Sequence, residues 1–413
     1  MHTTDHVSPG LSVTEHEFTV PLVHDSPDGR ELTVFAREVV AAGRERKELP
    51  WLVFFQGGPG FEATRPLGPD DPVWLRTALK DHRVLLLDQR GTGRSTPVDR
   101  PLGKTAEEQA EYLANFRADA IVRDADLIRL ELGVDRWTVL GQSFGGFCVV
   151  RYLSAAPEGL SAALITGGLP PLECHLDDVY RATYERVSQR NVAFYERYPE
   201  DRRRVRTIVE RLEEDDVRLP SGDRLTPRRF RQLGVMLGMG DGFERLHFLL
   251  ELPFASRAFL HDVDAAYPFA RNPLYAVIHE ACCATGYATR WSAERVMPER
   301  FRDDPTWFTG EHVYPWMLEE YESLRPFEAA ARVLAEWEWP VLYDLDVLRG
   351  NEVPVAAAIY ANDLYVERAF SEETARTIRG SRPWITNEFE HDGLRVAGDR
   401  ILERLLDLVH NRA

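Results

Sequence analysis

Apolar residues follow two different patterns along this chain, and each pattern predicts one kind of element. Short continuous apolar runs bounded by glycine, proline or charged residues are typical of buried strands. Segments 17–23 and 31–39 flank Ser26-Pro27-Asp28-Gly29, which predicts an opening hairpin with its turn at 26–29. The other predicted strands are residues 51–55, 84–87, 137–140, 162–166, 353–361 and 384–389.

The middle of the chain has apolar residues at helical spacing instead. Segments 177–187 and 203–212 carry apolar stripes that alternate with charged faces. A chain of 413 residues is long enough for a large core and a second subdomain. We therefore predict an α/β protein whose core, residues 1–172 and 340–413, is interrupted by a helical cap at 173–339.

The segment Gly141-Gln142-Ser143-Phe144-Gly145-Gly146 joins the strand at 137–140 to a predicted buried helix at 147–153. Strand, Gly-x-Ser-x-Gly and helix form the pattern of a nucleophile elbow, in which a sharp turn strains the serine backbone. The serine hydroxyl would project at a helix N-terminus, where N–H groups favour developing negative charge. Ser143 is therefore a candidate nucleophile. The alternative is a serine that only caps the helix.

A glycine-rich segment, Gln56-Gly57-Gly58-Pro59-Gly60, follows the strand at 51–55. Glycines at a strand end allow the backbone to approach a substrate closely. An elbow serine needs two backbone N–H donors for the oxyanion, one from the residue after it and one from the loop after an early strand. Phe144 and either Gly57 or Gly58 are the candidates, and the alternative for the glycine segment is a plain β-turn.

A second glycine-rich loop, residues 88–95, follows the next predicted strand. It lacks the third glycine of a dinucleotide-binding motif and the Gly-Lys-Ser/Thr of a P-loop. We expect Asp88, Arg90 and Arg94 to make it an ion-paired structural loop beside the site. No cofactor is expected.

The motifs QGGPG, DQRGTGRS and GQSFGG occur in this order. This order resembles the prolyl aminopeptidases (proline iminopeptidases) of the α/β-hydrolase fold. Gln56, where the usual glycine motif begins with His, is similar to the longer bacterial branch of that family. The resemblance is specific over 50–170 and near the C-terminus, and weaker in between. It implies a mostly parallel sheet flanked by helices, an inserted helical cap, and release of N-terminal proline from peptides through an acyl-enzyme.

The acid of a catalytic triad in this fold comes after the serine and before the histidine. The acid must lie directly after the end of a strand, and Asp363 follows the strand at 353–361. Asp344 and Asp346 are rivals, but they precede that strand in a segment of mixed polarity. Asp363 is the candidate acid, with a turn or cap residue as the alternative.

The histidine must lie on a loop after the last strand. Only His391 and His410 follow Asp363, and His410 lies in the terminal segment, beyond the predicted final helix at 399–406. We therefore expect His391 to accept the proton of Ser143 and to protonate the leaving amine. Asp363 would hold its tautomer and stabilise the imidazolium.

Two cap carboxylates, Glu280 and Glu311, stand in aromatic, weakly polar segments. A buried substrate ammonium needs a carboxylate partner, because desolvation otherwise dominates. The resemblance implies that such acidic residues hold the substrate's amino group. The alternative is that each caps or pairs within a helix. Nearby aromatic residues would either wall a small ring pocket or form the cap core: Trp291, Trp307, Phe308 and Tyr314.

The composition of the chain limits which ligands and cellular locations we expect. With 67 acidic and 50 basic residues the formal charge is −17, which argues against nucleic acid and favours a cationic ligand. No apolar run reaches membrane-spanning length, and the N-terminus has no signal-peptide pattern. The four cysteines have no metal-site spacing, so we expect no metal and reduced thiols in a cytoplasmic enzyme. Nothing in the sequence predicts an oligomeric state.

The expected partner is a peptide with N-terminal proline. Two other functions stay open: an esterase or amidase for a small substrate without a free amine, and a non-catalytic binding module. The set Ser143, Asp363 and His391 argues against the second of these.

Overall fold

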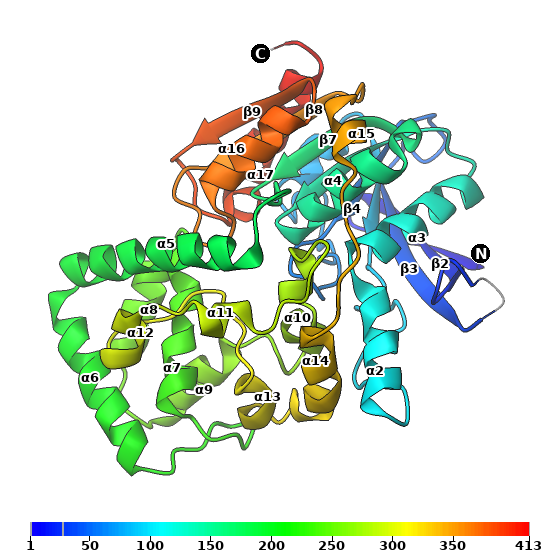
Figure 1. Cartoon of the computed structure of the whole chain (residues 1–413). Coiled ribbons are helices and arrows are strands. Elements are labelled where there is room, and N and C mark those ends of the chain that lie inside the picture. The colour runs from blue at the N-terminus through cyan, green and yellow to red at the C-terminus, as the bar shows by residue number, and fades with distance from the viewer. Residues whose placement is uncertain (1, 27–28, 413) are drawn as a thin grey trace.

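One nine-stranded sheet runs through the computed structural model, which describes residues 2–26 and 29–412 (Figure 1). The strand order is β1-β2-β3-β5-β4-β6-β7-β8-β9. The pairs β1–β2, β2–β3 and β3–β5 are antiparallel, and the remaining pairs are parallel. This confirms the predicted α/β class. The strands are β1 (His2–Ser8), β2 (Leu11–Pro21), β3 (Glu31–Ala41), β4 (Trp51–Phe55), β5 (Arg83–Leu87), β6 (Trp137–Gln142), β7 (Leu160–Thr166), β8 (Val355–Tyr360) and β9 (Ser381–Thr386).

Helices beside the sheet come from both ends of the chain. They are α1 (Leu75–Ala78), α2 (Ala106–Leu113), η1 (Ala114–Phe116), α3 (Ala118–Glu131), α4 (Phe144–Ala155), η2 (Pro157–Gly159), α15 (Leu345–Arg349), α16 (Arg368–Thr377) and α17 (Gly393–Val409).

Between β7 and α15 the chain forms a lobe of helices, coloured green to yellow in Figure 1. Most buried apolar side chains of this lobe form one hydrophobic cluster, in which Phe194, Phe230 and Phe308 are fully buried. Leu274 and Ile278 belong instead to the cluster of the core. The helices are α5 (Leu176–Arg197), α6 (Pro199–Glu214), α7 (Pro227–Arg231), η3 (Gln232–Gly238), α8 (Gly242–Glu251), α9 (Arg257–Ala265), α10 (Pro273–Val277), η4 (Glu280–Cys282), α11 (Ser292–Arg295), α12 (Glu299–Asp303), α13 (Met317–Glu320), η5 (Arg325–Phe327) and α14 (Glu328–Ala335).

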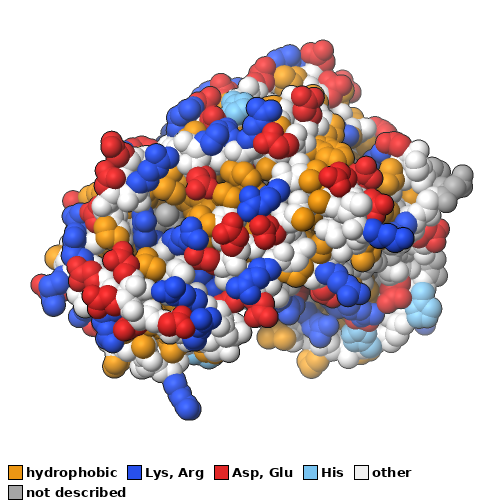
Figure 2. All heavy atoms as spheres, turned by 60° about the horizontal axis from the view of Figure 1, so that its bottom comes forward, with side chains coloured by type: hydrophobic (Ala, Val, Ile, Leu, Met, Phe, Trp, Pro, Cys, Tyr) orange, Lys and Arg blue, Asp and Glu red, His pale blue; other side chains and the backbone are white. Residues whose placement is uncertain are grey.

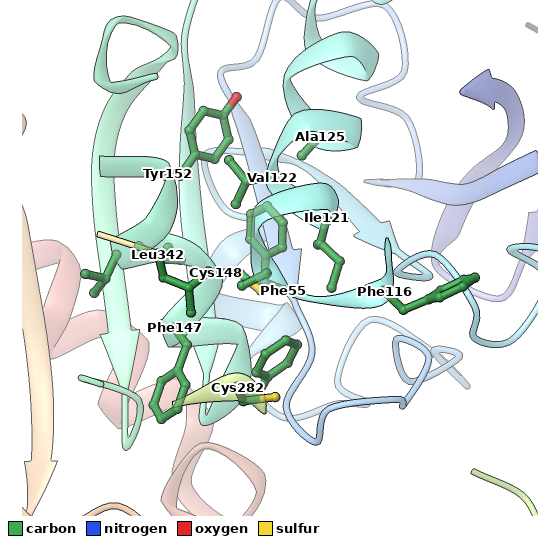
Figure 3. Packing of buried hydrophobic residues seen from close by; sticks show 14 of the residues in the cluster. Phe55, Phe116, Ile121, Val122, Ala125, Phe147, Cys148, Tyr152, Cys282 and Leu342 are labelled. Atoms are coloured by element: carbon green, nitrogen blue, oxygen red, sulfur yellow. The ribbon is translucent and has the colours of Figure 1, made fainter. Parts of the chain in front are cut away.

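The central strands are apolar throughout because both faces of the sheet are covered. Successive strand residues point to opposite faces. In β4, Val53 and Phe55 therefore join one core cluster, and Leu52 and Phe54 join the other. The first cluster includes α3 and α4, and Figure 3 shows Phe55 packed among their side chains, including Tyr152. The second includes α1 and α17.

Several boundaries differ from the sequence predictions. β2 begins at Leu11 rather than at residue 17. β9 begins three residues before the predicted 384–389 and includes Pro383, which an edge strand tolerates. α17 begins at Gly393 rather than 399, before a kink at Ala397. β1 was not predicted, since its residues are polar and mostly exposed. The predicted hairpin is present as β2–β3, and its turn includes residues 27–28, which lie outside the described part.

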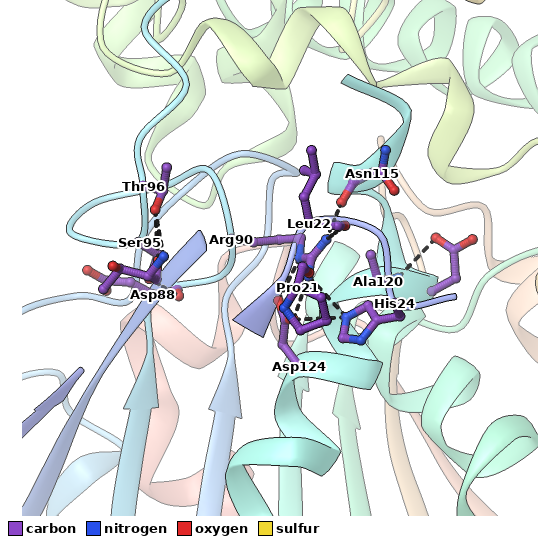
Figure 4. A network of polar contacts seen from close by, with 12 residues as sticks. Pro21, Leu22, His24, Asp88, Arg90, Ser95, Thr96, Asn115, Ala120 and Asp124 are labelled. Atoms are coloured by element: carbon purple, nitrogen blue, oxygen red, sulfur yellow. Dashed lines mark hydrogen bonds and ion pairs between the residues drawn. The ribbon is translucent and has the colours of Figure 1, made fainter. Parts of the chain in front are cut away.

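The loop after β5 is anchored mainly through Arg90, which is buried (Figure 4). Its guanidinium binds Asp124 of α3, with Nε 2.6 Å from Oδ2, and donates to the carbonyl oxygens of Pro21 and Leu22. Arg94 pairs with Glu15 and Glu17 of β2. The prediction of an ion-paired loop is therefore correct for both arginines. The arginines join the loop to the antiparallel end of the sheet and to α3.

Asp88 was predicted to be ion-paired as well, and this is wrong for the described residues. Its carboxylate accepts backbone N–H groups of Ala63 (3.2 Å) and Arg94 (3.0 Å). Burial raises the pKa of Asp88 to about 6, since desolvation outweighs these hydrogen bonds. The neighbouring Gln89 amide donates to the carbonyl of Gln56 (2.9 Å), so this loop supports the glycine-rich segment after β4.

Acidic and basic side chains are interspersed on the face shown in Figure 2, with apolar side chains between them. The acidic excess of the sequence is accompanied by surface ion pairs, such as Arg332 with Glu319 and Glu328. Such exposed pairs contribute little stability individually.

Candidate active site

Ser143 stands between β6 and α4 with φ 55° and ψ −124°, a conformation that is strained for a residue with a side chain. A Cβ at Gly141 would lie 2.3 Å from the carbonyl oxygen of Gly145. A Cβ at Gly145 would lie 2.0 Å from the carbonyl oxygen of Phe55. Both positions therefore require glycine, and the turn has the geometry expected of an elbow.

The glycine-rich segment lies directly against this elbow. A Cβ at Gly57 would be 3.0 Å from Cβ of Ser143 and 2.5 Å from Oε1 of Gln142. Gly58 has a φ of 129° and lines the same cavity as Ser143 and Phe144. The three predicted oxyanion residues thus surround the serine.

His391 and Asp363 form a buried pair. Nδ1 of His391 lies 2.7 Å from Oδ2 of Asp363, and the other carboxylate oxygen accepts the N–H groups of Tyr365 (2.9 Å) and Val366 (3.0 Å). Asp363 follows β8, and His391 lies between β9 and α17. Burial alone would lower the pKa of His391, but the charge and hydrogen bond of Asp363 outweigh it, so this pKa is raised above 6.5.

The serine and the histidine each pack against the loop after β7, on neighbouring glycines. A Cβ at Gly167 would lie 3.3 Å from Nδ1 of His391, and a Cβ at Gly168 would lie 2.3 Å from the carbonyl oxygen of Ser143. His391 therefore lies against Gly167 and Ser143 against Gly168, at the carboxyl end of β7.

The rival acids are engaged elsewhere. Asp344 is the N-cap of α15 and accepts the N–H groups of Asp346 (3.0 Å) and Val347 (3.1 Å). Asp346 pairs with Arg349 within the same short helix. The contacts of both carboxylates therefore lie within α15, and the carboxylate that binds His391 is that of Asp363.

A small cavity of about 60 Å³ is lined by Ser143 from the core and by Glu311 from the cap. Most of its remaining wall is apolar, as in ligand sites that use a few polar groups for orientation. Tyr275 donates its hydroxyl to Oε1 of Glu311. The wall includes Phe144, Phe147, Leu176, Val179, Tyr180, Leu364 and Tyr365.

Glu280 is not among the residues that line this cavity. Its Oε1 accepts the N–H of Ala293 (3.0 Å), and burial raises its pKa to about 7. The structure therefore brings only one of the two predicted cap carboxylates to the serine. The four cap aromatics belong to the hydrophobic cluster of the cap rather than to the cavity wall: Trp291, Trp307, Phe308 and Tyr314.

The sequence analysis missed His312, which is buried in the cavity wall beside Glu311. Its Nε2 lies 3.0 Å from Oγ1 of Thr183, and this hydroxyl is positioned to donate to the carbonyl of Tyr180 (3.2 Å). The hydroxyl therefore accepts from Nε2–H, which leaves Nδ1 as an acceptor. Nδ1 has no hydrogen-bond partner among the described residues, and burial lowers the pKa of His312 to about 3, so the ring is neutral. Adjacency to Glu311 was the only sequence signal.

Within the described ranges, no group of three or more His, Cys, Asp or Glu side chains is arranged to hold a metal ion. The four cysteines, all described, are free thiols. None of the helices formed by residues 2–26 and 29–412 combines the length and the apolar character needed to cross a membrane.

Comparison with known proteins agrees with this geometry. A family model described as the alpha/beta hydrolase fold matches residues 50–263. A proline iminopeptidase of Aeromonas sobria is 46% identical over 419 aligned residues, which span 98% of each chain. A proline iminopeptidase of Aspergillus aculeatus is 35% identical, over 98% of this chain and 96% of its own.

Other proline iminopeptidases are similar to this chain over a shorter segment. A proline iminopeptidase of Xanthomonas citri is 33% identical over 118 residues, covering 29% of this chain and 32% of its own. Because two relatives match essentially end to end, the similarity includes the cap as well as the core. The chain belongs to the proline iminopeptidase family of the α/β-hydrolase fold.

Proposed function

We propose that this protein is a serine aminopeptidase that releases N-terminal proline from peptides through an acyl-enzyme. The observation that carries the proposal is the cavity that joins Ser143 to Glu311, in a chain whose full-length relatives are proline iminopeptidases. A nucleophile and a carboxylate in one small, mostly apolar cavity suit a compact residue that carries a positive charge.

In this mechanism Oγ of Ser143 attacks the carbonyl carbon of the proline residue while His391 takes the hydroxyl proton. The Asp363 carboxylate keeps the proton of the neutral imidazole on Nδ1, so that Nε2 is free to act as base. The raised pKa of His391 also favours the imidazolium that forms during attack.

The tetrahedral oxyanion is held by the N–H of Phe144 and an N–H from Gly57 or Gly58. Collapse breaks the peptide C–N bond as His391 protonates the leaving nitrogen. Water activated by the same histidine then hydrolyses the prolyl ester on Ser143 and restores the enzyme.

The substrate's amine is bound in the cap by Glu311. A protonated N-terminal proline has two N–H donors because its nitrogen is part of the ring. We assign one to the carboxylate of Glu311, whose other oxygen is held by Tyr275, and one to Nδ1 of His312. Two acceptors for two donors leave no buried polar group unpaired.

Three sequence predictions remain part of the proposal. Glu280 is the second candidate for the amine, and the Gln variants of both carboxylates decide between them. The division into a core of residues 1–172 and 340–413 and a cap of 173–339 is supported by the strands, all of which lie outside 173–339 in the described part of the chain. The free cysteines suit a cytoplasmic location.

A panel of aminoacyl chromogenic amides, each with and without an N-terminal block, tests this function. We expect turnover of the free prolyl amide, much weaker turnover of other aminoacyl amides, and none of the blocked prolyl amide. Equal turnover of blocked and free substrates would instead identify an amidase that does not recognise an amine. Failure of every amide and ester with folded protein would favour a binding module.

A further inference from the structure

A second, larger cavity has the catalytic histidine in its wall. It has a volume of about 430 Å³ and is lined by His391 and Gln142, the residue before Ser143. The cavity that contains Ser143 and Glu311 is about 60 Å³. The larger volume falls in the range of ligand sites, whereas the smaller one suits only a compact group.

The chemistry of acylation decides what each cavity holds. The acyl part of the substrate must reach Ser143 with its amine toward Glu311, which assigns the proline residue to the small cavity. The leaving nitrogen must lie beside His391, which protonates it. The rest of the peptide therefore extends into the cavity that His391 lines.

We propose that this larger cavity is the leaving-side subsite, which binds an apolar residue directly after proline within an extended peptide. The inference rests on the proposed aminopeptidase function. Apolar residues from the core and from the cap both line it, including Trp74 and Val73 from the core and Met239 from the cap. Two side-chain amides, Gln56 and Gln142, also line it and suit hydrogen bonds to a peptide backbone.

The charges of the cavity favour an extended peptide over a dipeptide. Arg395 is the only arginine or lysine among the described lining residues. It pairs with Asp392, which also accepts the N–H of Gly240 (3.1 Å), and it lies 3.7 Å from Asp241. Asp71 adds another carboxylate to the wall. The free carboxylate of a dipeptide would therefore find no unpaired cation, whereas an amidated or longer chain would need none.

Substrates that share the prolyl group test the subsite directly. They all form the same prolyl-enzyme, so differences in their leaving groups appear in kcat/KM, which reports the steps up to acylation. We expect kcat/KM to be about ten- to a hundredfold higher for Pro-Phe-NH2 than for Pro-Gly-NH2, from burial of the phenyl ring. We also expect the free acid Pro-Phe to be poorer than Pro-Phe-NH2.

Met239→Asp adds a carboxylate to this cavity from the cap side, and Val73→Asp adds one from the core side. Each should remove most of the preference for Pro-Phe-NH2, because it lowers kcat/KM for Pro-Phe-NH2 more than kcat/KM for Pro-Gly-NH2. Retained turnover of Pro-Gly-NH2 shows that the variant is folded. Leu67→Asp is the matched control, because Leu67 is 79% exposed on the same loop as Val73 and does not line the cavity.

Equal kcat/KM for the two amides in the natural enzyme would overturn the subsite while leaving the aminopeptidase function intact. So would a Met239→Asp enzyme that keeps the full preference. A natural enzyme that cleaves none of the prolyl substrates would instead contradict the function on which the inference rests.

Discussion

Replacing Glu311 by Gln removes the negative charge from the cap side of the small cavity while keeping the size and hydrogen-bonding groups of the side chain. Glu311 shares this cavity with Ser143, and Tyr275 donates to one of its oxygens. In the proposed complex its other oxygen faces the substrate ammonium. The variant therefore leaves a positive charge without its partner in a mostly apolar enclosure.

The expected fall in kcat/KM follows from the free energy lost when a buried charge loses its partner. Removing one member of a buried charged pair costs about 3–5 kcal/mol. Glu311 is only partly buried before substrate binds, so the lower end applies. At about 1.4 kcal/mol for each factor of ten, a loss of about 3 kcal/mol lowers kcat/KM for a free-amine prolyl substrate by roughly two orders of magnitude.

The assay compares prolyl β-naphthylamide with a small neutral activated ester in the same enzyme preparation. The ester should react at nearly the natural rate, because the serine, histidine and oxyanion donors are unchanged. Glu319→Gln is a matched control, since it removes an exposed carboxylate of the same cap. An equal loss on both substrates would assign Glu311 a structural role. No loss on either would contradict the assignment of the amine to this residue.

Four further predictions concern the serine, the acids and pH. Ser143→Ala should lower turnover by on the order of a millionfold in a folded protein, and near-normal activity would exclude Ser143 from the mechanism. Asp363→Asn should lower kcat by about ten-thousandfold through the wrong imidazole tautomer, whereas Asp344→Asn should change activity little; the opposite ranking would reassign the acid. Since only neutral His391 is a base and its pKa is raised, kcat/KM should rise with pH through a midpoint above 6.5, and an acid limb centred below 6.5 would contradict this. Because the pKa of Glu280 rises from 4.5 to about 7 on folding, stability should fall as pH increases across this window, by on the order of 3 kcal/mol; urea unfolding of Glu280→Gln should lack this component, and an unchanged pH dependence would refute it.

Local sequence patterns were sufficient for the elements that form the core of the molecule. Apolar runs identified the parallel strands because a strand covered on both faces has no polar side. The elbow was equally visible, because Gly141 and Gly145 leave no room for a side chain next to the strained Ser143. The order of motifs along the chain then selected His391 and Asp363, which the structure joins at 2.7 Å. The prediction for β9 was displaced by three residues, because this edge strand begins in the partly polar segment Ser381-Arg382-Pro383, which has no apolar run to mark it.

Only the tertiary structure decided which cap residues face the serine. Glu280 and Glu311 both stand in aromatic, weakly polar segments, yet packing turns one toward the backbone of Ala293 and leaves the other in the cavity with Ser143. The open acceptor of His312 depends on Thr183, more than a hundred residues away in the sequence. Periodicity describes how a segment buries its own apolar face. The direction of a single polar side chain depends instead on partners from other segments, whose positions are set only when the helices of the cap pack together.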